Sequence, residues 1–283
     1  MPKIDPGHYV ETAVLWVSRS FAGAFEVVSH LLTALVSAVQ WALASPSPLV
    51  VIAMLSLLAL LARRVVLAAF TLAAFALILS MDLWAPTVET LALVVVSTGV
   101  AVLIGIPLGI WCAVSAGISV TTRPVLDFMQ TLPAYVYLIP AVFFFGVGLV
   151  PAIVATAIFA IPPAVRMTEL GIRQVDGELI EAAHAFGAHP WRILREIQLP
   201  LAMPSIMAGI NQVIMLSLSM VVICGLVGAG GLGSMVVSAV TQLDVGGGFN
   251  SGLAVVILAI FLDRLTAALG QSVSRRRRRR KSP

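Results

Sequence analysis

Residues 176–200, DGELIEAAHAFGAHPWRILREIQLP, form a polar interval between two long apolar runs. The run IVATAIFAIPPAV (153–165) lies before it, and IMAGINQVIMLSLSMVVI (206–223) lies after it. Charged side chains are costly in hydrocarbon, at about 2.5–3.5 kcal/mol each near the centre of a membrane helix. We therefore expect this interval to lie in water or against a soluble partner, between two membrane-spanning helices.

The first half of the interval carries the signals of a short helix. Asp176 can cap a helix that begins at Gly177, and the acidic side chains of Glu178 and Glu181 suit the positive end of its dipole. Gly187 is a natural left-handed terminator. These signals predict a helix that begins at Gly177 and stops before Gly187.

The second half predicts another short helix. Pro190 fits its first turn, and the helix carries Arg192 and Arg195. Pro200 can open the next helix in the same way. Together the two halves indicate a compact helix–turn–helix finger held between two spans.

The composition indicates a polytopic membrane protein. Of the 283 residues, 60% are hydrophobic and 11% are charged, which is more apolar surface than a soluble domain can bury. Cys112 and Cys224 lie far apart in apolar segments, which favours two core residues over a disulfide framework. The four histidines show no ligand spacing, so we expect no metal site, and no constellation of catalytic residues is found.

The fold class expected is an all-α membrane bundle with about seven spans. Pro107, Pro133 and Pro140 are expected to kink helices, and Gly105-x-x-x-Gly109 allows close helix packing. The predicted spans are 48–62, 65–80, 87–115, 125–148, 151–168, 200–225 and 247–268.

Four regions follow from this pattern: an N-terminal helix (1–46), two N-terminal spans (47–86), a core domain (87–270) that includes the polar loop 169–200, and a polybasic tail (271–283). Apolar residues such as Val10, Val14 and Val17 recur at steps of three and four, which predicts an amphipathic helix on the membrane surface or against the bundle. A cleaved signal peptide is less favoured, because the region before Ala42-x-Ala44 is long and carries a net charge of −1.

The basic residues predict the orientation. With seven spans and the finger inside, 15 of the 17 Lys and Arg residues lie on the inner side, and only Lys3 and Arg19 lie outside. Short loops rich in Lys and Arg stay in the cytoplasm. We therefore expect the N-terminal helix on the outer face and the C-terminus in the cytoplasm.

Several motifs resemble a known family, the permease subunits of bacterial ABC importers. Glu181-Ala182-Ala183, Gly187 and Ile197-x-Leu199-Pro200 are similar to its EAA loop, a cytoplasmic coupling helix that docks into a cleft on the ATPase subunit. The resemblance implies coupling roles for Glu178, Glu181, Ala182, Ala183, Gly187, Arg192, Leu199 and Pro200.

The wider match resembles the subclass that imports glycine betaine, proline and choline. It is carried by Asp127-x-x-Gln130-x-Leu132-Pro133, LPLAMPSIMAGINQ (199–212), LSMVVI (218–223), GAGGLG (228–233) and IFLDR (260–264). This resemblance implies a type I-like importer in the bacterial inner membrane, with two permease copies, two P-loop ATPase subunits, and a periplasmic or lipid-anchored substrate-binding protein. The solutes implied are glycine betaine, choline, proline betaine or proline.

A glycine-rich stretch formally matches a dinucleotide-binding pattern. No strand precedes it and no acidic residue follows at the required distance, so this interpretation is rejected. We expect instead a flexible outer-face connection near the gate, formed by Gly228, Gly230, Gly231 and Gly233. The chain has no GxxxxGK[ST] sequence, so ATP and Mg²⁺ would be bound by a separate ATPase and no cofactor by this chain.

Polar and aromatic residues within the spans are candidates for a substrate pathway. Intramembrane polar groups face a bundle interior or a wet pathway, so interhelical hydrogen bonding is an equal alternative for each. Tyr135 and Tyr137 lie near Phe143, where packing is favoured over a cage for a quaternary ammonium ion. The candidates are Gln130, Tyr135, Tyr137, Asn211, Gln212 and Ser217.

The tail from Arg275 to Arg280 with Lys281 is polybasic. Binding to the anionic inner leaflet is favoured over binding to nucleic acid. Three alternatives to an osmoprotectant importer remain: a permease for methionine, taurine or another small solute, an ion-driven secondary carrier, and a membrane scaffold that transports nothing.

Overall fold

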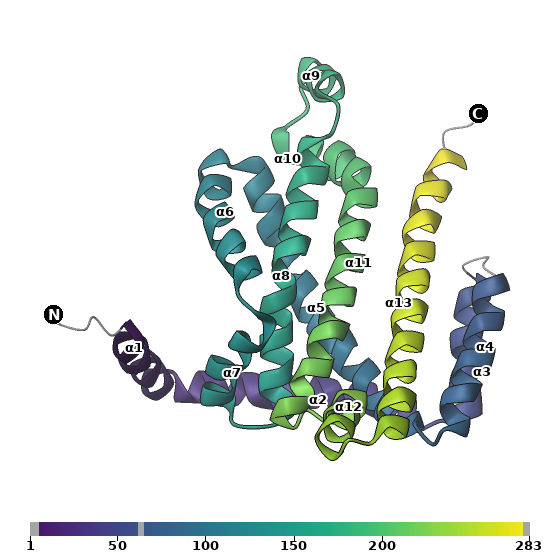
Figure 1. Cartoon of the computed structure of the whole chain (residues 1–283). Coiled ribbons are helices and arrows are strands. Elements are labelled where there is room, and N and C mark those ends of the chain that lie inside the picture. The colour runs from purple at the N-terminus through teal and green to yellow at the C-terminus, as the bar shows by residue number, and fades with distance from the viewer. Residues whose placement is uncertain (1–5, 62–64, 280–283) are drawn as a thin grey trace.

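The structure, a computed structural model, describes residues 6–61 and 65–279. Within these ranges it contains helices and no strand. The long helices α8 (Leu149–Arg173), α11 (Leu199–Ile223) and α13 (Val245–Arg279) run side by side, and α5 (Trp84–Val114) packs along α8 (Figure 1). The predicted helical membrane bundle is therefore confirmed.

Glycines bring the central helices into close contact. A Cβ atom on Gly105 would lie 2.5 Å from Cβ of Ala164, and one on Gly109 would lie 2.6 Å from the carbonyl oxygen of Val165. On the other side of α8, a Cβ on Gly209 of α11 would lie 2.7 Å from Cβ of Met167. The GxxxG motif therefore acts in packing, as small residues do where membrane helices approach closely.

The span count of seven is not supported. In the described part of the chain, five helices are long and apolar enough to cross a membrane, and a bent pair would make a sixth. The five are α2 (Ala22–Ala44), α5, α8, the stretch Pro190–Val227 and the part of α13 from Val245 to Ala268. The predicted spans 48–62 and 65–80 appear as the shorter helices α3 (Pro48–Leu61) and α4 (Val65–Ser80).

The predicted span 125–148 is wrong as a single helix. The helix α6 (Ala116–Thr131) ends before Pro133, and η1 (Ala134–Tyr137) and α7 (Leu138–Phe145) continue at an angle of 109°. Leu132 is extended, with φ −70° and ψ 134°, because the residue before a proline is pushed out of the helical region. The Tyr137 hydroxyl donates a hydrogen bond to the Met129 carbonyl across the bend.

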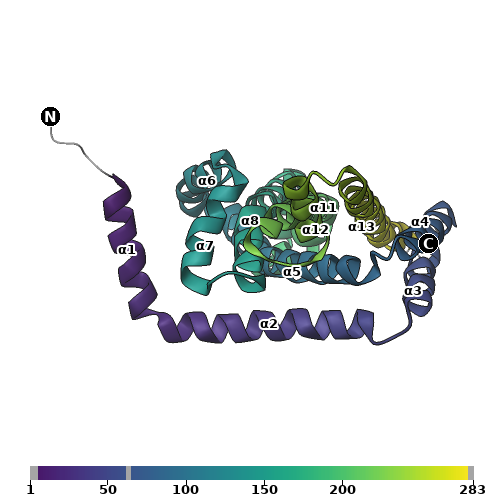
Figure 2. The ribbon, with the colours of Figure 1, turned by 60° about the horizontal axis from the view of Figure 1, so that its bottom comes forward.

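The N-terminal region forms two helices rather than one, α1 (Pro6–Ser20) and α2. Figure 2 shows α2 lying across the end of the bundle, alongside α5. Its buried side chains are Leu32 and Val36, whereas Leu31 and Leu35, which continue the predicted spacing of Val10, Val14 and Val17, are exposed. The contact with the bundle is thus made by a neighbouring stripe, which leaves the predicted face available to lipid.

The two ends of the bundle differ (Figure 1). The short helix α9 (Gly177–Ala185) protrudes at the end where α13 terminates, whereas α2, α7 and α12 (Gly231–Gln242) lie at the opposite end. The helix α13 continues past residue 270 into the predicted tail as far as Arg279. Lys3, Arg63, Arg64, Arg280 and Lys281 lie outside the described residues.

Candidate functional site

The finger, residues 176–200, begins with the predicted cap. Oδ1 of Asp176 accepts a hydrogen bond of 3.0 Å from the backbone N–H of Glu178, and α9 starts at Gly177. At the other end, Gly187 has a φ of +75° and the N–H of Ala188 donates to the Ala183 carbonyl at 3.0 Å. This closes the helix through a left-handed residue. The predicted cap and terminator are both confirmed.

The second half of the finger is continuous with the following span. Helix α10 (Pro190–Ile193) starts at Pro190 and passes through the π-helical turn η2 (Leu194–Gln198) into α11. Helix α11 begins at Leu199 with Pro200 in its first turn, so the prediction that Pro200 opens the next helix is confirmed. Pro200 has no N–H to donate. Just before it, the Leu199 N–H donates to the Leu194 carbonyl, which closes the wide π turn and keeps the backbone hydrogen-bonded.

The finger presents apolar side chains outside the bundle. Leu179, Phe186 and Trp191 are 48%, 92% and 62% exposed. Large exposed apolar groups on a protruding element are typical of a protein interface, where aromatic residues are enriched. The finger therefore has the chemistry of a docking element.

The predicted coupling residues are distributed along this finger and its base. Arg192 is exposed and its Nε lies 3.0 Å from both carboxylate oxygens of Glu196. Ala183, Leu199 and Pro200 are half-buried, while the other members of the set are exposed: Glu178, Glu181, Ala182 and Gly187.

A buried carboxylate at the base of the finger was missed by the sequence analysis. Oε1 of Glu169 accepts hydrogen bonds from Ser119 Oγ at 2.7 Å and from Arg123 Nη2 at 3.2 Å, and it lies 2.9 Å from Arg173 Nε. Arg173 Nη2 also donates to the carbonyl of Cys112 at 2.8 Å. This cluster ties α5, α6 and α8 together just before the finger. The spacing of Glu169 and Arg173, four residues apart in an apolar helix, was the available signal.

Two of the predicted pathway residues make contacts within the protein. Asn211 Nδ2 donates to Asp263 Oδ1 at 2.7 Å, and Asn211 Oδ1 accepts from Thr266 Oγ1 at 2.9 Å, which links α11 to α13. Tyr137 packs its ring against Phe159 at a centroid distance of 5.7 Å. For Asn211 and Tyr137 the structure favours the packing alternative.

The other four candidates are not brought together by hydrogen bonds among the described residues. Ser217 is fully buried, and its Oγ has no hydrogen-bond partner there. Gln130, Tyr135 and Gln212 are exposed. These three therefore remain free to face a solute or a second chain.

The glycine-rich connection is hydrogen-bonded to a distant helix. It contains η3 (Cys224–Val227) and the start of α12, which the sequence analysis did not predict. The Gly231 N–H donates to Glu89 Oε2 at 2.7 Å, and the Leu232 N–H donates to Thr90 Oγ1 at 2.8 Å. Glu89 and Thr90 belong to α5, so a distant helix satisfies the open N–H groups at the start of α12.

The glycines themselves are required by backbone geometry and close packing. Gly228 and Gly230 have φ values of +73° and +82°. A Cβ on Gly233 would lie 2.6 Å from the Val221 carbonyl oxygen. These glycines thus form a tight turn before α12, and the flexibility and gate position expected for them stay predictions.

Comparison with known proteins finds a matching family and similar proteins. A family model described as "binding-protein-dependent transport system inner membrane component" matches residues 105–279. The glycine betaine/carnitine transport permease protein GbuB of Listeria monocytogenes is 50% identical, over 96% of this chain and 97% of that protein. The glycine betaine transport system permease protein OpuAB of Bacillus subtilis is 47% identical, over 94% of each chain.

A solved structure is also similar. The inward-facing MetNI methionine ABC transporter matches with a TM-score of 0.62 and 26% identity, over 68% of this chain and 95% of that chain. The matched fraction leaves about a third of this chain without a counterpart there.

Proposed function

Because this chain belongs to the family of binding-protein-dependent transport system inner membrane components, we propose that it imports small quaternary-ammonium osmoprotectants as the membrane-spanning subunit of an ABC importer. Its role is transport rather than catalysis. The solutes proposed are glycine betaine first, with proline betaine, choline, carnitine and proline as further candidates. The observation that carries this proposal is the full-length similarity to two permeases named for glycine betaine, at 50% and 47% identity.

The finger is proposed to dock into a separate P-loop ATPase. Its exposed Leu179, Phe186 and Trp191 offer an apolar contact outside the membrane. Acidic residues at the start of α9 and the exposed Arg195 give that contact a defined charge pattern. Two ATPase subunits, with ATP and Mg²⁺, would then act on two fingers, one from each copy of this chain.

The helical connections of the finger explain how motion would reach the membrane. On one side, the helix from Pro190 to Val227 is continuous through its π turn. On the other side, Glu169 holds the end of α8 to α6, so the finger is not hinged freely. Displacement of the finger by the ATPase is therefore transmitted to α8 and α11 together.

A second copy of this chain is proposed to cover α11. The exposed positions of α11 recur at steps of three and four and form one stripe: Leu201, Pro204, Ala208, Gln212, Met215 and Ser219. Gln212 and Ser219 are polar groups at membrane depth, where polar side chains face a wet pathway rather than lipid. We infer that this stripe lines the solute pathway between two copies, which receive solute from a substrate-binding protein.

The finger is proposed to face the cytoplasm. The basic residues predicted to lie inside outnumber those outside by 15 to 2. The end of α13 lies at the same end of the bundle as the finger (Figure 1), in agreement with this assignment.

The function is tested by reconstituting the full-length chain in proteoliposomes with its ATPase and substrate-binding protein. We expect ATP-dependent uptake of labelled glycine betaine, with methionine and taurine carried poorly. Uptake by this chain alone under an ion gradient would instead identify a secondary carrier. Uptake of methionine or taurine in preference to glycine betaine would change the substrate class but keep the family.

A further inference from the structure

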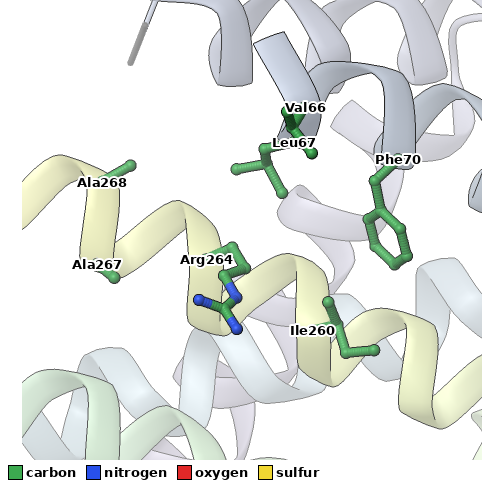
Figure 3. A pocket seen from close by; sticks show the side chains of 7 residues that line it. All are labelled: Val66, Leu67, Phe70, Ile260, Arg264, Ala267 and Ala268. Atoms are coloured by element: carbon green, nitrogen blue, oxygen red, sulfur yellow. The ribbon is translucent and has the colours of Figure 1, made fainter. Parts of the chain in front are cut away.

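A cavity lies between α4 and α13, on a side of the molecule that the proposed transport function does not use. Its volume is about 420 Å³, within the range of about 300–1,000 Å³ that is usual for small-molecule sites. Figure 3 shows the side chains around it, in which a single guanidinium lies among apolar groups. The lining residues are Val66, Leu67, Phe70, Ile260, Arg264, Ala267 and Ala268.

The cavity exists because α4 and α13 separate toward the finger end. Phe75 of α4 and Phe261 of α13 are both buried, with ring centroids 5.2 Å apart at an interplanar angle of 78°. Near this contact, Leu67 is buried, whereas Val66 is 85% exposed and Ile260 is 40% exposed. The cavity therefore has a closed apolar floor and opens sideways, where a membrane protein meets lipid.

Arg264 lies near the finger end of the apolar sequence of α13. It precedes Gln271, where polar and then basic residues begin, by seven residues. At a rise of 1.5 Å per residue this places it about 10 Å from the end of that apolar sequence. A long cationic side chain at this depth extends toward the interface. The cavity thus runs from the headgroup level into the hydrocarbon.

The guanidinium of Arg264 has N–H donors available for a ligand. Its Nε lies 3.7 Å from Oδ2 of Asp263, and the other oxygen of that carboxylate accepts a hydrogen bond of 2.7 Å from Asn211. No further ion pair of Arg264 is found in the described ranges 6–61 and 65–279. The remaining N–H groups of an arginine fit a phosphate in a bidentate manner.

We propose that this cavity binds an anionic phospholipid, with its phosphate on Arg264 and an acyl chain between α4 and α13. The sequence concentrates positive charge near these two helices, since the run from Arg275 to Lys281 begins within the last part of α13 and Arg63-Arg64 precede α4 directly in the sequence. Such a field attracts a net negative headgroup more strongly than a zwitterionic one. The bound lipid fills the gap between the α3–α4 hairpin and the rest of the bundle.

The test measures lipid retention, so its result does not depend on transport. The full-length chain is extracted from bilayers of equal parts phosphatidylglycerol and phosphatidylcholine, and retained lipid is counted by native mass spectrometry. We expect phosphatidylglycerol to be retained in preference. Arg264→Gln should lower its retention about tenfold, as for the loss of charge-assisted hydrogen bonds. Arg195→Gln removes the same charge from an exposed position on the finger and should change nothing.

A second variant separates the cavity from the charge. Ala267 is exposed, so Ala267→Phe can fill the opening without disturbing the core, and it should lower retention while Arg264 stays in place. Equal retention in Arg264→Gln and Arg195→Gln would overturn the proposal. Equal retention of the two phospholipids would do so too. Displacement of the lipid by an excess of inorganic phosphate would indicate a soluble-anion site instead.

Discussion

One carboxylate oxygen of Glu169 contacts three polar side chains, two on α6 and one on α8. The Glu169 side chain is only 8% exposed, so its charge is sheltered from water. Removing one partner of a buried charge cluster leaves the others uncompensated. Here Arg123 and Arg173 are 60% and 39% exposed, and solvent screening reduces the effect. Replacing the carboxylate is thus expected to have a moderate effect.

Glu169→Gln should lower the free energy of unfolding by about 1–3 kcal/mol, because the two guanidinium groups lose their counter-charge. Thermal unfolding of the detergent-solubilised chain measures this. The control is Glu196→Gln, which breaks the exposed pair with Arg192 and should cost less than about 1 kcal/mol. Equal effects of the two substitutions would mean that the Glu169 cluster does not hold the base of the finger.

At Gly187 the constraint is conformational. Its φ is +75° and an added Cβ would meet nothing within 4 Å, so only the left-handed backbone opposes a side chain. Gly187→Val should cost about 1–2 kcal/mol in the finger and lower uptake per ATP hydrolysed, while the protein still reaches the membrane. Gly187→Asn, which tolerates this conformation, should retain coupling. Normal uptake by the valine variant would count against the role of the finger.

At the scale of elements, the contact between α5 and α8 depends on Gly109. An added Cβ would lie 2.6 Å from the Val165 carbonyl and 2.7 Å from Cβ of Thr168, so the helices would have to separate. Gly109→Ala should therefore destabilise the bundle by about 1–3 kcal/mol, seen as a lower unfolding temperature. Gly99 lies on the same helix with nothing within 4 Å of its Cβ position. Gly99→Ala should leave stability unchanged or raise it by about 0.5–1 kcal/mol.

The sequence predicted the elements whose signals are local. The Asp176 cap and the Gly187 terminator act within a few residues, so both could be read without a structure. The bend after α6 was also signalled locally by Pro133, yet its angle depends on how η1 and α7 pack. The start of α12 could not be predicted, because Glu89 lies 142 residues away from Gly231 and only the fold brings them together.

For the whole molecule, the decisive property is which side of the membrane the finger faces. Inversion would translocate most of the basic residues, including the run from Arg275, against the tendency of short basic loops to stay in the cytoplasm. It would also place Phe186 and Trp191 away from any ATP-hydrolysing subunit. The finger can couple to an ATPase in the cytoplasm only if it faces the cytoplasm. One labelling experiment that determines the side of the finger therefore also tests its coupling role.

Phe186→Cys and Leu243→Cys place a thiol at each end of the bundle, at positions that are 92% and 86% exposed. The native Cys112 and Cys224 are buried and free, so background labelling should be low. In cells that make this chain without its ATPase, a membrane-impermeant maleimide should label Leu243→Cys directly and Phe186→Cys only after the inner membrane is opened. The reverse order would place the finger outside and remove the basis for ATP-driven coupling through it. Labelling of both in intact cells would mean that the two residues lie on one side, which contradicts a bundle spanning the membrane between them.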